Sequence, residues 1–179
     1  MQKHNNYFFG GRIKLIFVCT LLLFTFSYST CKYGFRDAAP IGDEIKTFRV
    51  NQLENRATYV NPQLAPQLTE KLKQKIINTT RLKQTNSDDA HYDISGYVNQ
   101  YFTSTVGISG NQAATNRLTV GFHLIFKHAF DEKKNQEVDI TRSFDFPASQ
   151  TLPQAEAVLF PEIIRNIVDE VFNKIFSNW

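Results

Sequence analysis

Hydrophobic residues in the central part of the chain recur at every second position, the pattern of β-strands with one buried face. Three consecutive segments follow it, which predicts an antiparallel meander of three long strands. Their apolar positions are Tyr92, Ile94, Val98 and Phe102, then Leu118, Val120, Phe122, Leu124 and Phe126, then Val138, Ile140 and Phe144. Segments 107–116 and 131–136 predict the connecting loop and turn. A strand of 13 residues would span about 43 Å, so we expect the hairpin ends to project from the body.

Two other segments repeat their apolar residues with the period of an α-helix. The first has apolar residues four positions apart, and Asn61-Pro62 predicts its start. These residues are Leu64, Leu68, Leu72 and Ile76. The second helix is predicted over 152–176. Pro161 lies inside it, so we expect a kink or a restart there.

Two short β-rich segments flank the first predicted helix, at 44–50 and 81–85. The predicted element order is therefore β-α-β-β-β-β-α. Each helix has one apolar face, which predicts an α+β two-layer sandwich with both helices packed on one face of a mixed four- to five-stranded sheet. The first β-α-β unit is expected to pair its strands in parallel through a right-handed crossover.

The first 30 residues differ in character from the rest of the chain. Lys3, Arg12 and Lys14 are their only charged residues, and Leu15–Phe26 is a run of 12 residues without charge. A membrane-spanning helix needs about 20 apolar residues. A basic start followed by a short apolar run is typical of a secretory signal peptide, which we assign to 1–30.

Cys31 follows this predicted signal peptide directly. The arrangement resembles a bacterial lipobox, in which cleavage makes the cysteine the first residue and its thiol carries lipid. Tyr28 and Thr30 differ from the usual lipobox residues, and ordinary cleavage nearby would instead leave Cys31 as a spare thiol. We predict lipidation at Cys31, because a single leftover cysteine in an exported chain otherwise lacks a partner. Residues 31–43 are then a lipidated tether, and 44–179 form one domain.

Removal of the signal peptide changes the charge of the chain. All 17 acidic residues follow Cys31, and three of the 20 basic residues precede it, so the mature charge is 17 − 17 = 0. A nucleic-acid partner would require a basic excess, and none is expected. The mature chain of 149 residues would have one cysteine and no internal disulfide, so its stability must come from a buried core.

The sequence shows no pattern typical of catalysis or of a cofactor site. It has no G-x-S-x-G motif and no Gly-rich loop after a strand. His123 and His128 are five residues apart in a predicted strand, so they should point to opposite faces and not share a metal. We therefore predict a protein that is not an enzyme, with no cofactor and no metal. Tyr97 and Tyr101 are placed on the more polar side of their strand, where they would suit a partner interface; packing into the core is the equal alternative.

Taken together, several segments give the chain a resemblance to a known family. They are CKYGFRD at 31–37, TFRVNQLENRATYVNPQLAPQLTEKL at 47–72, DISGYV at 93–98, NRLTV at 116–120, RSFDF at 142–146 and VDEVFNKIFSNW at 168–179. In their order and spacing the chain resembles the LptE family in its Bacteroidetes-type form. That family consists of outer-membrane lipoproteins of lipopolysaccharide transport.

The resemblance implies two helices on a mixed sheet, an outer-membrane location through a lipid anchor, and a domain on the periplasmic side or within a barrel lumen. It implies the β-barrel LptD as a partner, which the chain would plug and help to assemble, and a part in delivering lipopolysaccharide to the outer leaflet. By position only, the candidates for lipid binding are Arg117, Lys127, Lys133 and Lys134. The rival hypotheses are a periplasmic lipid carrier, which would need an internal cavity, and an exported hydrolase, which would need polar groups converging in a cleft.

Overall fold

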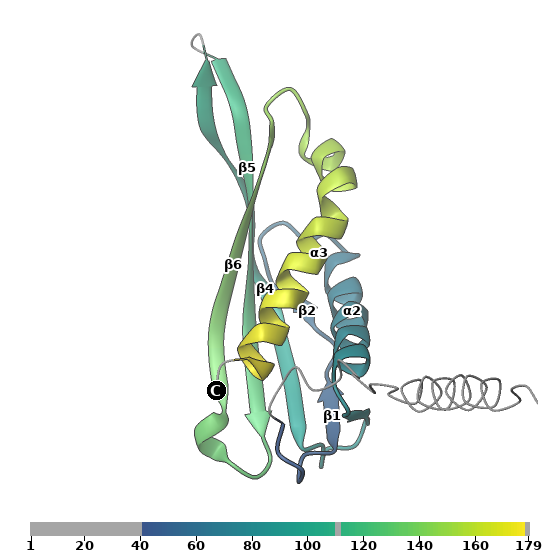
Figure 1. The fold of residues 1–179 in the computed structure, drawn as a ribbon. Coiled ribbons are helices and arrows are strands. Elements are labelled where there is room, and N and C mark those ends of the chain that lie inside the picture. The colour runs from purple at the N-terminus through teal and green to yellow at the C-terminus, as the bar shows by residue number, and fades with distance from the viewer. Residues whose placement is uncertain (1–40, 110–111, 178–179) are drawn as a thin grey trace, which may run out of the picture. The chain divides into compact units, whose positions relative to one another are not determined.

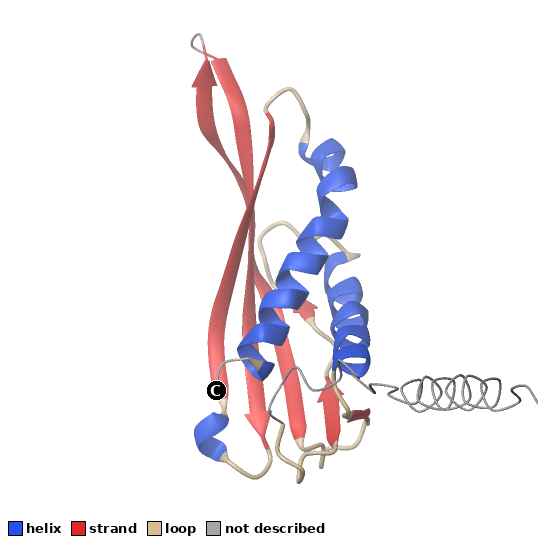
Figure 2. Ribbon diagram, viewed as in Figure 1, coloured by secondary structure: helices blue, strands red, loops and turns tan. Residues whose placement is uncertain are grey.

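The computed structural model describes residues 41–109 and 112–177, and these form a mixed sheet with helices on one face (Figures 1 and 2). All of them belong to one of the two compact units of the chain, Phe35–Trp179. The elements in order are β1 Thr47–Val50, β2 Glu54–Asn55, α2 Leu64–Thr79, β3 Lys83–Gln84, β4 Tyr92–Ser109, β5 Gln112–His128, the short 3₁₀ helix η1 Glu132–Lys134, β6 Gln136–Pro147 and α3 Leu152–Phe176. The predicted signal peptide and Cys31 lie outside the described residues.

The six strands are ordered β3-β1-β4-β5-β6, and β2 also pairs with β4. The strands β1 and β3, which flank α2, pair in parallel as predicted, and β4, β5 and β6 form the predicted antiparallel meander. The α+β class is confirmed, with more strands than the predicted four to five. The additional strand β2 has only two residues, which is too short to show an alternating pattern.

Both helices pack on the same face of the sheet (Figure 2), as predicted for the two-layer arrangement. The apolar stripe of α2 is buried against the core at all four predicted positions. The predicted stripe of α3 is buried as well, at Ile164, Ile167, Val168, Val171, Phe172 and Ile175. One hydrophobic cluster joins these residues to the strands, so burial of apolar surface holds the layers together.

The ends of the helices differ in detail from the prediction. α2 begins at Leu64, two residues after the predicted start. Asn61 accepts a hydrogen bond from the Gln63 backbone N–H at 3.0 Å and forms the turn before the helix. α3 runs without a break through Pro161, so the expected restart does not occur. Ala157, whose carbonyl loses its helical partner at this proline, is exposed to water.

The prediction was wrong about the faces of β4 beyond Val98. The register with β5 passes from Val98↔Phe122 to Gln100↔Gly121, so Asn99 is an extra, bulged residue. A bulge of one residue exchanges the faces of the residues that follow it, here as far as the next irregularity, between Thr105 and Gly107. Tyr101 is therefore in the core with 2% of its surface exposed, whereas Phe102, predicted to be buried, is 50% exposed.

The predicted loop at 107–116 is also wrong, because β4 continues to Ser109 and β5 begins at Gln112. In Figure 1 this hairpin extends past the N-terminal end of α3, as expected for strands of such length. At the other end of β5, the predicted polar turn at 131–136 contains η1.

Candidate functional site

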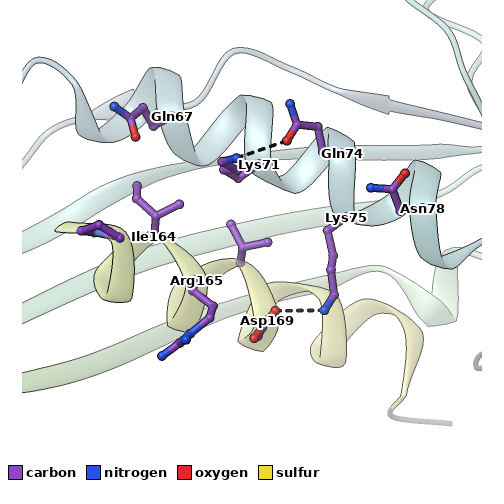
Figure 3. A pocket seen from close by; sticks show the side chains of 10 residues that line it. Gln67, Lys71, Gln74, Lys75, Asn78, Ile164, Arg165 and Asp169 are labelled. Atoms are coloured by element: carbon purple, nitrogen blue, oxygen red, sulfur yellow. Dashed lines mark hydrogen bonds and ion pairs between the residues drawn. The ribbon is translucent and has the colours of Figure 1, made fainter. Parts of the chain in front are cut away.

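A groove of about 370 Å³ lies between α2 and α3, on the side of the helices away from the sheet (Figure 3). Its apolar part consists of Pro161, Ile164 and Val168 of α3. Its polar rim contains three cations, one carboxylate and three amides, namely Lys71, Lys75, Arg165, Asp169, Gln67, Gln74 and Asn78. The groove, called here the α2–α3 groove, thus combines an apolar floor with an excess of positive charge.

The cations of the groove differ in the partners they have. Lys75 forms an ion pair with Asp169 across the two helices at 3.1 Å, and its ammonium lies 5.5 Å from the Phe172 ring. Within the part of the chain that the structure describes, Lys71 has one hydrogen bond, to the Gln74 amide oxygen at 3.4 Å. Among the described residues, Arg165 forms no hydrogen bond or ion pair. Two positive charges therefore border an apolar floor without an anion opposite them, which suits a ligand with both anionic and apolar parts.

The opposite face of the sheet holds a second polar cluster, centred on His123. Its Nδ1 lies 2.8 Å from Asp139 and its Nε2 lies 2.9 Å from Glu137. Only a protonated imidazole donates from both nitrogens, so the hydrogen bond to Asp139, and then that to Glu137, raises the pKa of His123. Tyr97 stacks on the imidazole at 4.9 Å, and Arg56 lies 4.1 Å over the Tyr97 ring.

A third cluster is built around Glu156, a carboxylate of α3 that is only 8% exposed. It accepts hydrogen bonds from Tyr59 Oη and Asn61 Nδ2, each at 3.3 Å, and from Tyr101 Oη. Burial of Tyr101, and next its hydrogen bond to Glu156, raises the pKa of the phenol well above its ordinary value. The three donors provide the hydrogen bonds that a buried carboxyl group needs. Because they come from β4 and from the loop before α2, these hydrogen bonds also connect both to α3.

The structure does not bring the four predicted lipid-binding residues together. Arg117 binds Asp145 on β6 with two hydrogen bonds of 2.6 and 2.9 Å, and the Arg117 guanidinium lowers the pKa of Asp145. Lys127 is ten positions further along β5, roughly 33 Å away in an extended strand. Lys133 and Lys134 lie in η1 beyond it. These residues remain separate candidates and do not form one site.

The two tyrosines predicted for a partner interface have different environments. Tyr97 is half-buried beneath Arg56 on the outer face, where a contact with a partner stays a prediction. Tyr101 is part of the core, which was the alternative left open by the sequence. His123 and His128 lie on opposite faces as predicted, since His128 is buried and its desolvation lowers its pKa.

Two further observations concern metals and membranes. Within the described ranges 41–109 and 112–177, no three His, Cys, Asp or Glu side chains are grouped so that they could hold a metal ion. Neither of the helices described there is long and apolar enough to span a bilayer.

Comparison with known proteins gives a family match over most of the chain. Residues 45–175 match the LptE family, described as lipopolysaccharide-assembly. No curated protein matches the chain.

Solved structures with a similar fold include a hypothetical protein from Chlamydia trachomatis, with 7% identity and a TM-score of 0.50 over 75% of this chain and 99% of that one. An uncharacterized lipoprotein B from Nitrosomonas europaea has 17% identity and a TM-score of 0.49, covering 74% and 84%. Rare lipoprotein B from Shewanella oneidensis has 15% identity and a TM-score of 0.48, covering 70% and 93%.

Proposed function

Because the chain belongs to the LptE family of lipopolysaccharide-assembly proteins, we propose that it is an outer-membrane lipoprotein that plugs a β-barrel of the LptD kind. In this proposal it assists assembly of that barrel and helps to deliver lipopolysaccharide to the outer leaflet. The observation that carries the proposal is the family match over residues 45–175. The protein acts by binding and not by catalysis.

The packing of the domain supports a plug rather than a lipid carrier. A carrier that encloses a lipid needs space between the sheet and the helices. The gap there, bordered by Leu68 of α2, Phe122 of β5 and Val171 of α3, has no volume for even one water molecule. The lumen of an outer-membrane barrel is polar, and a domain with its own filled core and a charged surface is suited to such a lumen.

The proposed location at the outer membrane depends on acylation of Cys31. Acylation of this residue would hold the domain at the outer membrane, since several acyl chains anchor a protein firmly where one chain alone binds only marginally. The domain itself then needs no spanning segment.

Capture of the tagged chain from detergent-solubilised outer membrane tests the partner. We expect a large β-barrel of the LptD kind to co-purify in a fixed ratio with the wild-type chain. The Cys31→Ser variant, which cannot be acylated, should lose labelling by palmitate and yield less of the barrel. Recovery of the chain as a lone monomer, with labelling intact, would contradict the plug function.

We further propose that the α2–α3 groove contacts the anionic, acylated part of lipopolysaccharide. Its apolar floor and two cations, Lys71 and Arg165, which have no acidic partner in residues 41–109 and 112–177, are the groups that carry this assignment. A gel-shift titration with lipopolysaccharide should show weaker binding for the double variant Lys71→Ala/Arg165→Ala. The matched control is Lys127→Ala/Lys133→Ala, which removes the same charge at the far end of the sheet. Greater loss in the control would favour the residues predicted from sequence position and contradict the groove.

A further inference from the structure

The charged residues are distributed unevenly between the two ends of the domain. Four described segments contain no Asp, Glu, Lys or Arg, although these residue types make up 21% of the chain. They are 57–63 before α2, 100–107 of β4, 114–116 of β5, and 146–155 at the end of β6 and the start of α3. These four segments are called here the charge-free end.

The fold brings the four segments to the same end of the domain. The Ala148 backbone N–H donates a hydrogen bond of 3.2 Å to the Ala114 carbonyl, which joins the third segment to the fourth. Tyr59 stacks on Tyr101 with 5.4 Å between the ring centroids, which joins the first segment to the second. In Figure 1 this is the upper end, where the β4–β5 hairpin and the start of α3 lie.

The charged residues that flank these segments in the sequence all have partners within the chain. Arg56 pairs with Glu54 at 2.8 Å. Arg117 and Asp145 bind each other with two hydrogen bonds. Glu156 is buried and accepts hydrogen bonds from the Tyr59–Tyr101 side. A partner that covered the charge-free end would therefore not have to neutralise any of them.

The opposite end of the domain is rich in charge. It consists of residues 41–46, 81–89 and 127–134, the lower end in Figure 1, and is called here the charged end. The chain enters the domain there, because the Arg81 guanidinium donates to the Ile41 carbonyl at 2.6 Å and pairs with Asp43 at 2.8 Å. The predicted lipidated tether is thus joined to the charged end.

The composition of the charge-free end is typical of a surface that a partner covers. Charges are costly to remove from water, so the centres of protein interfaces are poor in them and rich in aromatic residues. Four of the seven large hydrophobic side chains that are exposed in the described part of the chain lie here. They are Tyr59, Val60, Phe102 and Val106.

The other exposed residues of this end favour a protein surface over lipid as the partner. They include Thr58, Gln63, Thr103, Ser104 and Gln154. Hydrocarbon would leave these hydroxyl and amide groups without hydrogen bonds, at a cost for each group. The polar lumen of a barrel supplies donors and acceptors, and an uncharged surface meets no like charge there.

We propose that the charge-free end enters the barrel and lies against its wall, directed toward the cell surface, while the charged end stays at the periplasmic mouth. This inference rests on the proposed plug function and gives it a direction. The ten residues from Cys31 to Ile41 reach at most about 36 Å, so an acylated Cys31 keeps the charged end near the periplasmic leaflet. The 16 residues from Tyr92 to Gly107 span roughly 50 Å, more than the hydrocarbon core of about 30 Å.

Photo-crosslinking in cells tests this direction with two exposed phenylalanines, Phe102 of the charge-free end and Phe130 of the charged end. Benzoylphenylalanine replaces one of them at a time in the full chain. At position 102 it should crosslink to the barrel, in the half that carries the long extracellular loops. At position 130 it should reach only the periplasmic turns or give no crosslink to the barrel. The reverse order would overturn the inference, as would crosslinks from position 102 to lipid or to a second copy alone.

Substitutions at the same two positions test the role of the missing charge. Phe102→Asp places a charge against the barrel wall and should lower the amount of co-purified barrel by at least about tenfold. Phe102→Gln is similar in exposure but uncharged and should lose much less. Phe130→Asp should leave the amount of barrel within about twofold of wild type. Circular dichroism of each purified chain shows whether the fold is kept, and a folded Phe102→Asp chain that retains the barrel would overturn the inference.

The outcomes distinguish this inference from the proposed function. A wild-type chain that co-purifies with the barrel but crosslinks to it only from position 130 keeps the plug function and overturns the direction. A wild-type chain that is recovered without any barrel overturns the plug function, and the direction with it.

Discussion

Substitution of Gly96 by alanine tests the central strand pair β4–β5, which contributes residues to the His123 cluster and to the Glu156 cluster. Gly96 lies opposite Leu124 in the β4–β5 ladder. A Cβ atom at this position would lie 2.3 Å from the backbone oxygen of His123 and 2.6 Å from the Phe122 ring. The oxygen belongs to the backbone and cannot rotate away, so β4 and β5 must separate by about 1 Å, compared with a normal strand spacing of about 4.8 Å.

The magnitude follows from two costs. Overpacking a filled core costs about 1–3 kcal/mol, and weakening one ladder hydrogen bond costs about 1 kcal/mol more. We therefore expect Gly96→Ala to lower the free energy of unfolding by about 2–4 kcal/mol. For a domain of this size the melting temperature falls by about 2–4 °C per kcal/mol, which gives a decrease of about 4–16 °C.

Thermal unfolding followed by far-ultraviolet circular dichroism measures this change. Gly107→Ala is the matched control, because its Cβ would lie 3.1 and 3.2 Å from atoms of the Thr115 side chain and no closer than 3.6 Å to the Thr115 backbone nitrogen, near the end of the hairpin. We expect that variant to lose less than about 1 kcal/mol. If Gly96→Ala melts at the wild-type temperature, or no lower than Gly107→Ala, the close approach of β4 to β5 described above is wrong.

Two further predictions concern the polar clusters. Because its carboxylate partners raise the pKa of His123, the stabilisation is fully present below the unfolded pKa of about 6.5 and is lost as the pH rises through the higher folded value. In urea titrations the stability advantage of wild type over His123→Gln should therefore be largest below about pH 6.5 and shrink as the pH rises above it; an advantage independent of pH would refute this account. Tyr101→Phe removes a buried hydrogen bond to Glu156 and should cost about 1.5–3 kcal/mol, measured by the same titration. Tyr59→Phe should cost less, since Tyr59 is 41% exposed and water can replace its hydroxyl; equal costs would contradict the burial argument.

Much of the fold could be predicted because hydrophobic residues recur with a clear period along its long helices and strands. Alternation in β5 and a four-residue stripe in α2 each place several apolar residues on one face, and burial favours only one arrangement of such faces. The prediction failed where one residue decides the result. The bulge at Asn99 has no composition that marks it in the sequence, yet it moves Tyr101 into the core and Phe102 out of it.

The extent of the strands was also underestimated at one end. Segment 107–116 contains glycine and asparagine, which usually indicate a loop. In the structure Gly107 remains within β4, with Thr115 as its cross-strand neighbour. Local composition favours a turn there, but the ladder already formed by residues further along both strands continues through it. Tertiary pairing overrides the local preference of these residues.

The α2–α3 groove could not be found from the sequence because neither helix shows it alone. Lys71 and Lys75 are one turn apart on the polar face of α2, which is the ordinary pattern of a solvated helix surface. They become part of a site only because α3, about 90 residues later in the chain, packs beside them and contributes Arg165 and an apolar floor. Position along the sequence instead favoured Arg117, which the fold pairs with Asp145. A cation is available to a ligand only where the fold leaves it without an acidic neighbour, and that depends on contacts between distant segments.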